Sequence, residues 1–288
     1  MIPSKDLTIV TLCENTVSGR DLLGEWGLSF SIRTPDTHLL FDTGAGSAGA
    51  ANADVLKVDL SDVQGILLSH GHFDHLGGLP AMVRKTRKRP LPVFGHPDIF
   101  VPKYSRKGDR VVYAGPQWAR EEAERLGAEF QLSKDPVRFH DDIILSGEEP
   151  RVTDFEFISD KLLVLDNHGK YVGDPMKDDQ SLFLVTDLGL VVLLGCAHRG
   201  MINILRYAVE ITGVDRVHMV VGGTHLMAAG DEQIEKSIQA LRDMRVEWVG
   251  VSHCTGGYAA VKLASAFKDH FFFNHTGTRI TFPFNRPV

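Results

Sequence analysis

The feature that most constrains the fold is a cluster of four potential metal ligands directly behind a short apolar run. Residues 63–68 have the character of a buried strand, and Pro80 is well placed to begin a helix soon afterwards. Imidazole groups crowded together repel one another once protonated and are costly to bury without partners. A solvated histidine-rich turn is the weaker interpretation, and we predict metal ligands on this strand-to-helix loop: His70, His72, Asp74 and His75.

Three later apolar runs show a related pattern, in which a strand is followed by glycine or serine and then by histidine. Strand ends fix side chains in place while the loops beyond them leave room for a substrate, so we expect these histidines to converge on one edge. Taken singly, each would more often be a hydrogen-bonded core or surface residue. Together with the cluster, they are predicted to complete the metal site: His198, His225 and His253.

Composition limits the classes of partner. The chain has 288 residues, of which 43% are hydrophobic and 24% charged, and its net charge is −6. It can therefore bury a full core, and it has no overall basic field to attract nucleic acid or an anionic membrane. No apolar run approaches the length of a bilayer span, and residues 1–6 lack the features of a secretory signal. Three widely spaced cysteines argue against a disulfide framework, so we expect a cytoplasmic location.

The order of predicted elements indicates an α/β (α+β) fold with two sheets and helices packed outside them. Strands come first, and helices are interleaved with strands mainly after the histidine cluster. Residues 182–194 are predicted to form a hairpin, 117–126 a helix and 95–116 an irregular stretch. We expect one domain over residues 1–288, in which residues 84–180 form an elaborated insertion or cap.

The motifs resemble those of the metallo-β-lactamase superfamily over nearly the whole chain. The resemblance rests on Phe-Asp-Thr-Gly at residues 41–44, on the cluster at 70–75 and on the later histidines at strand ends. It implies a four-layer αββα sandwich with a dinuclear metal site at one edge. It also implies that Asp42 orients the cluster as the carboxylate partner of a ligand. By the same resemblance the first metal is held by His70, His72 and His198, and the second by Asp74, His75 and His253.

One departure from the family concerns the aspartate that bridges the two metals. The family places it at the end of the strand before the last histidine, whereas here residues 217–223 are followed by Thr224 and His225. Asp215 lies before that strand, at its wrong end. Either His225 substitutes as a ligand or the site holds one tight metal. Two thiols beside ligand positions are interpreted as small buried residues rather than catalytic groups: Cys196 and Cys254.

Finer motifs resemble the dihydropteroate-synthase-like branch of this superfamily. They include Asp178-Asp179-Gln180-Ser181-Leu182, Gly195-Cys196-Ala197-His198-Arg199-Gly200 and Ser252-His253-Cys254-Thr255-Gly256. The branch is named for an archaeal enzyme that joins a dihydropterin diphosphate to a ribofuranosylaminobenzene phosphate, and many members are called only metal-dependent hydrolases. The resemblance implies two divalent ions as cofactors, with zinc favoured and manganese or iron as alternatives.

We therefore expect an enzyme that acts on a small anionic substrate, phosphorylated or pterin-like, through a dinuclear site and activated water. Bound metals lower the pKa of a shared water and polarise a phosphoryl or acyl oxygen, and Asp74 and Asp42 are predicted to have catalytic roles. A transferase that displaces diphosphate from a dihydropterin is the first alternative. A non-catalytic metal-binding or sensor protein is the second. We expect no nucleic-acid or membrane partner, and homodimer formation stays open.

Two further features bear on the substrate. Trp118, Tyr104 and Tyr113 are candidates to line a pocket for a flat ring such as a pterin, against a default position in the core or on the surface. Residues 255–257 precede a predicted helix and are placed to donate backbone N–H groups to a phosphate. A plain helix cap is an equal alternative for this segment.

Overall fold

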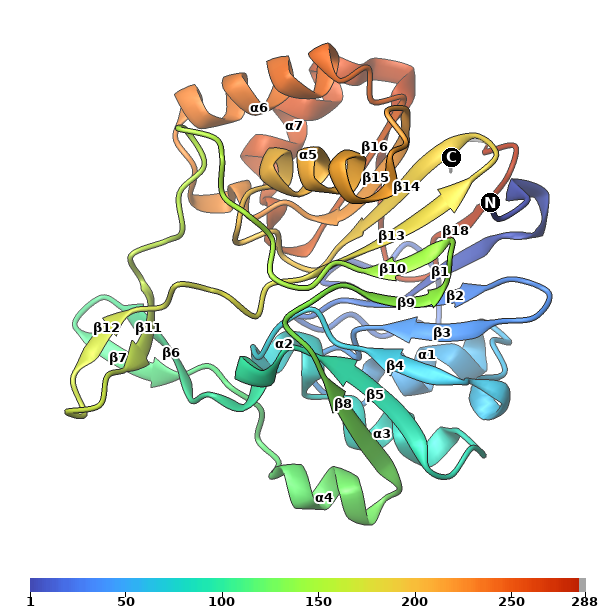
Figure 1. Ribbon diagram of the computed structural model, residues 1–288, viewed down its shortest axis with the longest axis vertical. Helices are drawn as coiled ribbons and strands as arrows, with labels where there is room; N and C mark the ends of the chain where they lie inside the picture. Colours follow the sequence, from blue (N-terminus) through green and yellow to red (C-terminus); the bar gives the residue numbers. More distant parts are fainter. Residues whose placement is uncertain (285–288) are drawn as a thin grey trace.

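Two seven-stranded sheets face each other and form the centre of the molecule (Figure 1). The computed structural model describes residues 1–284. The first sheet has the order β18 (Arg279–Thr281), β1 (Thr8–Cys13), β2 (Ser29–Arg33), β3 (His38–Phe41), β4 (Gly65–Leu67), β5 (Leu91–Gly95) and β8 (Ala128–Leu132). The second sheet has the order β17 (Phe271–Phe273), β16 (Trp248–Ser252), β15 (Val217–Gly223), β14 (Gly189–Leu194), β13 (Ser181–Thr186), β10 (Ile143–Leu145) and β9 (Val137–His140).

Helices cover the outer faces of both sheets. Two of them, α1 (Ala48–Val55) and α3 (Leu79–Lys85), pack on the first sheet (Figure 1). The second sheet is covered by α5 (Met201–Thr212), α6 (Asp231–Asp243) and α7 (Gly257–Phe267). The predicted four-layer αββα sandwich is therefore confirmed.

Strand β14 shows why the sequence produces these layers. Its side chains alternate between two apolar environments, because successive residues of a strand point to opposite faces. Val191 and Leu193 pack between the two sheets, whereas Leu190, Val192 and Leu194 pack against the helices. A strand that is buried on both faces must be apolar at every position, which is the pattern of a central strand in a covered sheet. The predicted hairpin over residues 182–194 is confirmed as β13 and β14.

The parallel strands bring distant parts of the chain to one edge of the sandwich. In the second sheet β14, β15 and β16 run parallel, and in the first sheet β3 and β4 run parallel. The carboxyl ends of parallel strands lie at the same edge of a sheet. The segments that follow these strands contain Asp42 and all the predicted ligands, in the order Asp42, residues 70–75, His198, His225 and His253.

Residues 84–180 differ from expectation in one segment. Residues 95–116 were predicted to be irregular, and this prediction is wrong: they contain β6 (Lys103–Lys107) and β7 (Arg110–Tyr113). These strands join β11 (Leu162–Leu165) and β12 (Tyr171–Gly173) in a four-stranded sheet that projects from the sandwich (Figure 1). Strand β6 is polar, and the other three strands are only three or four residues long, so they carry little of the alternating signal that identifies a strand. The single-domain organisation stays a prediction, and its last residues, 285–288, lie outside the described residues.

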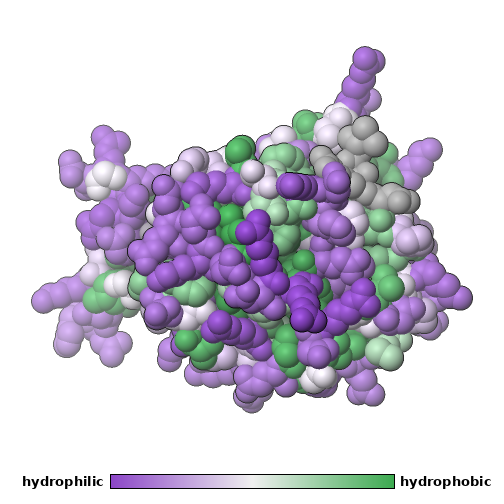
Figure 2. All heavy atoms as spheres, turned by 90° about the horizontal axis from the view of Figure 1, so that it is seen from above, coloured by the Kyte–Doolittle hydropathy of each residue, from purple (hydrophilic) through white to green (hydrophobic). Residues whose placement is uncertain are grey.

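Two short helices flank this region, and the surface is largely polar. Helix α4 (Arg120–Arg125) is shorter than the predicted helix at 117–126, and α2 (Phe73–Leu76) is a single turn within the ligand cluster. Figure 2 shows a face on which polar side chains predominate and apolar ones are scattered among them. Within residues 1–284, every helix is too short or too polar to cross a membrane.

Candidate metal centre

The ligand cluster is shaped by a close approach between two backbone segments. The loop after β4 passes so near residues 99–103 that a Cβ atom on Gly71 would lie 2.5 Å from the carbonyl oxygen of Ile99. Glycine is therefore required between the first two histidines. The amide of Gly71 donates to Asp178 Oδ2 at 2.8 Å, which ties the loop to the segment before β13. Helix α2 then begins directly after His72, so that Asp74 and His75 lie on one helical turn.

The first group of predicted ligands comes together around His70. Its Nε2 atom lies 3.2 Å from Nε2 of His198, and the ring of His72 lies 4.7 Å and 5.0 Å from the rings of His70 and His198, centroid to centroid. All three side chains are buried. The Nε2 atom of His72 is buried without a hydrogen-bond partner.

The second group comes together around His253. Its Nε2 atom lies 3.2 Å from His75 Nε2 and 3.2 Å from Asp74 Oδ2. The sulfur of Cys196 lies 3.1 Å from the same nitrogen of His75. Side chains separated by up to 179 residues in sequence thus meet at the edge where the parallel strands end.

These donors fit divalent metal ions. Two nitrogen ligands placed 2.0–2.1 Å from a tetrahedral zinc ion are about 3.3 Å apart, which follows from the geometry of the tetrahedron. The two Nε2–Nε2 distances of 3.2 Å match this separation. A buried nitrogen without a partner, as at His72, is costly unless something absent from the protein itself satisfies it. The set of imidazoles with one carboxylate also matches the donors that zinc, iron and manganese accept.

Carboxylate and amide groups orient the ligands from behind. Asp42 Oδ2 accepts from His75 Nδ1 and from Ser69 Oγ, both at 2.7 Å, and the Ser69 hydroxyl accepts from His70 Nδ1 at 2.9 Å. His253 Nδ1 donates to Asn15 Oδ1 at 2.9 Å. When Nδ1 donates its proton in this way, the lone pair of Nε2 is left to face a metal. The structure thus places Asp42 where the sequence predicted, although its catalytic role stays a prediction.

The backbone at this edge is unusually constrained. Among the described residues nine non-glycine positions have positive φ, and four of them follow the parallel strands: Asp42, Ala197, His225 and His253. Such conformations cost about 1–3 kcal/mol each and persist where surrounding structure imposes them, which is common at functional sites.

Electrostatics keep the first group of imidazoles neutral. Burial, reinforced by the neighbouring imidazoles, holds the pKa values of His70 and His198 well below the usual range for histidine. Burial also lowers the pKa of His72 to about 3. The neutral imidazole is the form that binds a metal, so these side chains have the required protonation state at neutral pH.

The second group differs because Asp42 lies beside it. Burial alone would lower the pKa of His75, but the negative charge and the hydrogen bond of Asp42 outweigh burial and raise it to about 9. Burial would raise the pKa of the Asp74 carboxyl, but His253 and His75 outweigh it and hold that pKa well below its usual range. Asp74 is thus ionised at neutral pH, and metal binding at His75 requires the release of a proton.

His225 and two thiols form a third group that sequence reasoning did not assemble. Ligand atoms of Cys196, His225 and Cys254 lie within 4.8 Å of one another, and the ring of His225 lies 4.2 Å from that of His198. The Nδ1 atom of His225 has no hydrogen-bond partner. The interpretation of Cys196 as only a small buried neighbour is incomplete, because its sulfur also lies within 4.8 Å of ligand atoms in both histidine groups. The available signal was its position one residue beyond the glycine that follows β14.

A buried ion pair connects the small sheet to the ligand loop. Lys103 of β6 is 2% exposed, and its ammonium group donates to Asp178 Oδ1 at 2.7 Å and to Asp174 Oδ2 at 2.9 Å. Burial would lower the pKa of Lys103, but the charges of the two carboxylates outweigh it and raise the pKa. Since Asp178 also accepts from Gly71, the pair holds the loop of His70 and His72 against the small sheet.

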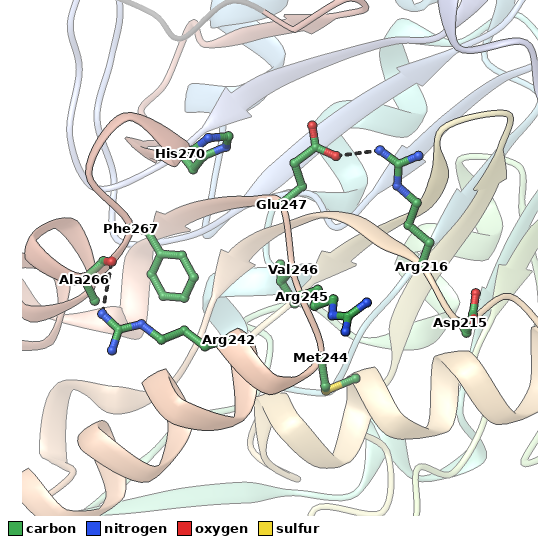
Figure 3. Close-up of a pocket in the computed structure, with 10 residues that line it drawn as sticks. All are labelled: Asp215, Arg216, Arg242, Met244, Arg245, Val246, Glu247, Ala266, Phe267 and His270. Atoms are coloured by element: carbon green, nitrogen blue, oxygen red, sulfur yellow. Dashed lines mark hydrogen bonds and ion pairs between the residues drawn. The ribbon is translucent and has the colours of Figure 1, made fainter.

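Two cavities lie at opposite ends of the strands, and one of them adjoins the candidate metal centre. A cavity of 610 Å³ lies at the amino ends of β15 and β16, and its lining includes Arg216, Arg242 and Arg245 (Figure 3). This is the edge opposite to the histidines. A second cavity of 400 Å³ borders His253 and is lined by Trp26, Met227, Phe273, His275 and residues 255–257, among others. Because it adjoins the candidate metal centre, the second cavity is the better candidate for a substrate.

The aromatic residues that were considered for a ring pocket have other positions. The indole N–H of Trp118 donates to the carbonyl oxygens of Leu76 and Gly77 at 3.1 Å, which supports the end of α2. Tyr104 and Tyr113 pack together on the small sheet, 5.8 Å between ring centroids. None of the three lines the cavity beside His253. The cavity contains other rings, Trp26 and Phe273, which the sequence did not single out.

An αββα sandwich with a histidine-rich centre at one edge defines the class of the protein, and sequence comparison identifies the family. A profile described as the metallo-beta-lactamase superfamily matches residues 27–198. The chain belongs to the metallo-β-lactamase superfamily. Its fold and its clustered histidines make it a metal-dependent, hydrolase-like member of that superfamily.

Three known proteins illustrate the relationship. The chain is 32% identical to the 7,8-dihydropterin-6-methyl-4-(beta-D-ribofuranosyl)-aminobenzene-5'-phosphate synthase of Methanocaldococcus jannaschii, over 96% of this chain and 97% of the synthase. It is 31% identical to the crystal structure of Tm1679, described as a metal-dependent hydrolase of the beta-lactamase superfamily, with a TM-score of 0.79 over 95% of this chain and 98% of that one. Zn(2+)-bound PqqB from Methylobacterium extorquens is 12% identical, with a TM-score of 0.55 over 95% of this chain and 99% of that one, and shares the fold alone.

Proposed function

We propose that the chain uses a dinuclear metal centre to act on a small anionic substrate, phosphorylated or pterin-like, by attack of an activated water. One observation carries the proposal. Two groups of buried imidazoles, each with an Nε2–Nε2 distance of 3.2 Å, lie at one edge of the sandwich beside a 400 Å³ cavity. Zinc is the proposed metal, and manganese and iron are the alternatives.

In this proposal the residues of the chain divide into ligands and groups that orient them. The ligands are His70, His72 and His198 around the first ion and Asp74, His75 and His253 around the second. His225 is a further candidate ligand beside the first ion, since its ring lies 4.2 Å from that of His198. When bound, the ions supply a water of lowered pKa and polarise the oxygen of the bond to be broken. Asp42 accepts a hydrogen bond from Nδ1 of His75, and Asn15 accepts one from Nδ1 of His253, so that both rings present Nε2. The Asp74 side chain is 11% exposed, and its Oδ2 atom contacts His253, which lines the cavity.

The residues that line the cavity beside His253 are suited to a flat, anionic substrate. The ring of Trp26 lies 5.0 Å from that of His253, and the rings of Phe273 and His275 are stacked 5.7 Å apart at its wall. Helix α7 begins at this cavity without a side-chain cap, so its first amides are left to hydrogen-bond an anion such as phosphate. A planar ring against the aromatic wall and an acidic group at the helix terminus would both be accommodated. The net charge of −6 favours a small molecule over nucleic acid as the partner, and we propose a cytoplasmic role.

Turnover of model phosphoesters by the metal-loaded protein tests this proposal. We expect hydrolysis of at least one phosphodiester, phosphomonoester or diphosphate ester in a panel that includes pterin phosphates, and its loss on treatment with a chelator. Incorporation of oxygen from labelled water into the phosphate would establish attack by water. A protein that binds two ions and hydrolyses none of these esters would contradict the hydrolase proposal.

A transferase is the second candidate, and its support is the relationship to the Methanocaldococcus jannaschii synthase. In that case the same site, with its metal ions bound, would hold a diphosphate leaving group while another nucleophile attacks. Release of inorganic diphosphate from a dihydropterin diphosphate, only when the aminobenzene co-substrate is present, is the expected result. Release at the same rate without the co-substrate would favour hydrolysis.

A further inference from the structure

The sulfur of Cys196 occupies a position that no other side chain shares. It lies within 4.8 Å of the ligand atoms of His70 and His198, and also within 4.8 Å of those of His75 and His253. It is thus the one donor common to both histidine groups among the metal-ligating clusters of the described residues. Its side chain is 3% exposed, so it is not reached freely by solvent.

The shortest distance from this sulfur to a ligand nitrogen is somewhat below the separation expected for two ligands of one zinc ion. A thiolate 2.3 Å and an imidazole nitrogen about 2.0 Å from the same tetrahedral zinc ion are about 3.5 Å apart. Cys196 Sγ and His75 Nε2 are 3.1 Å apart, and the contact is made by the nitrogen that also faces His253. A hydrogen bond between a thiol and an imidazole would be equally short, so this distance alone does not identify a metal ligand. The argument rests instead on the position of the sulfur between the two histidine groups.

Carboxylates do not occupy this shared position. Asp74 contacts His253 and belongs to the second group. Asp179 has an unpartnered oxygen, but that atom lies 4.0 Å from Nδ1 of His70, whereas the nitrogen that faces His198 is Nε2. The strand that was expected to supply a bridging carboxylate, β15, instead leads to His225. The place between the two groups is therefore left to sulfur.

We propose that Cys196 is a thiolate ligand that bridges the two metals, in the place where a carboxylate would otherwise stand. The inference rests on the dinuclear centre proposed above and specifies its chemistry. On binding, the S–H bond of Cys196 breaks, sulfur–metal bonds form with the sulfur lone pairs, and the proton leaves to solvent. A thiolate favours zinc, iron(II) and cobalt(II) over magnesium and manganese, which prefer oxygen donors.

Cys254 has a different place and supplies a matched comparison. Its sulfur lies in the third group alone, with His225 and Cys196, and it accepts the backbone amide of His225 at 3.3 Å. We therefore assign Cys254 to supporting the loop of His225. Cys13 is a third buried thiol, and it contacts Glu25 Oε1 at 3.3 Å, outside all three groups. The chain thus contains one thiol predicted to bridge, one beside the centre and one apart from it.

Cobalt substitution of the full chain distinguishes these roles without any need for turnover. Wild-type protein loaded with Co²⁺ is expected to bind two ions, counted by elemental analysis, and to show a near-ultraviolet sulfur-to-cobalt charge-transfer band. The band should disappear in Cys196→Ser and in Cys196→Asp and persist in Cys254→Ser and Cys13→Ser. Cys196→Asp restores a bridging carboxylate, so it should still bind two ions and gain affinity for Mn²⁺ relative to Zn²⁺ by about 10-fold or more.

Several outcomes would overturn the assignment. One is a charge-transfer band that survives in Cys196→Asp. Another is wild-type protein that binds two cobalt ions without showing the band. A third is loss of the band in Cys254→Ser alone. Cys196→Asp is also the control for folding. If this variant binds two ions, its metal centre is intact, and loss of the band then reflects loss of the thiolate. A wild-type band without hydrolysis would refute the proposed reaction and leave the thiolate assignment standing. Wild-type protein that binds no cobalt would refute both.

Discussion

The amino ends and the carboxyl ends of the parallel strands in the second sheet differ in how many of their polar groups have hydrogen-bond partners. At the amino ends of β15 and β16, two of the arginines that line the 610 Å³ cavity pair with other groups of its lining (Figure 3). Arg216 lies 2.9 Å from Glu247, and Arg242 donates to the carbonyl oxygen of Ala266 at 3.2 Å. At the carboxyl ends, buried nitrogens of His72 and His225 have no partner. One buried imidazole nitrogen at the amino ends, Nε2 of His218, also has no partner, but three such nitrogens cluster at the carboxyl ends, on His72, His198 and His225. The smaller cavity beside them is therefore the more informative one.

The largest effect should follow from removing a ligand at the carboxyl edge. His72→Ala is expected to lower the number of bound ions and to reduce any turnover by more than about 100-fold, beyond the range for residues that only orient ligands. Elemental analysis and kinetics of the metal-loaded protein measure both. Arg245→Ala, in the cavity of the amino edge, is the matched control and should change neither. Unchanged metal content in His72→Ala would contradict the proposed centre.

A buried ion pair and an exposed one provide the next comparison. Lys103→Met leaves Asp174 and Asp178 without their cation in a buried site, and we expect the free energy of unfolding to fall by about 3–5 kcal/mol. Arg216→Met breaks an exposed pair and should cost less than about 1 kcal/mol. Denaturant titration of both variants tests the difference. Equal losses would mean that Lys103 is not the link between the small sheet and the ligand loop.

Two Asp–His pairs allow a test of ligand orientation. Asp42→Asn is expected to weaken metal binding by about 10–100-fold, because the amide is a poorer acceptor for the His75 Nδ1 proton. Asp62 makes a similar contact to His38 Nδ1 at 2.6 Å, away from the centre, and Asp62→Asn should leave metal affinity unchanged. Competition with a chelator of known affinity measures both constants. A similar loss in the two variants would show that the effect is not specific to the centre.

The smallest expected effect concerns the pH dependence of stability at the amino edge. Burial would raise the pKa of Glu247, but hydrogen bonds from Arg216 and His218 outweigh it and hold the pKa below its ordinary value of 4.5. The stabilisation is therefore present above pH 4.5 and is lost as the pH falls through the lowered pKa.

Glu247→Gln should accordingly cost at most about 1 kcal/mol at pH 6 and progressively less below pH 4.5. Unfolding of chelator-treated wild type and variant at several pH values gives the difference. A difference that stays constant with pH would contradict this assignment.

Sequence periodicity was informative where strands are buried on both faces and uninformative where they are not. The apolar run of β14 and the strand before the histidine cluster were predicted correctly, because burial on both faces forces every residue to be apolar. The small sheet was missed, because only one of the nine residues of β6 and β7 is buried and the two strands carry lysine and arginine. Its contribution to the site through Lys103 was therefore also missed.

By itself, the sequence determined the apolar strands, the αββα class and the set of candidate ligands, because these are local patterns of residue type and spacing. Which donors share an ion depends on the relative placement of strands far apart in the chain. Only the tertiary structure decided that Cys196, and no carboxylate, lies between the two histidine groups, and that His225 joins the thiols. The physical reason is that the register of parallel strands sets distances at the ångström scale, which spacing along the chain does not encode.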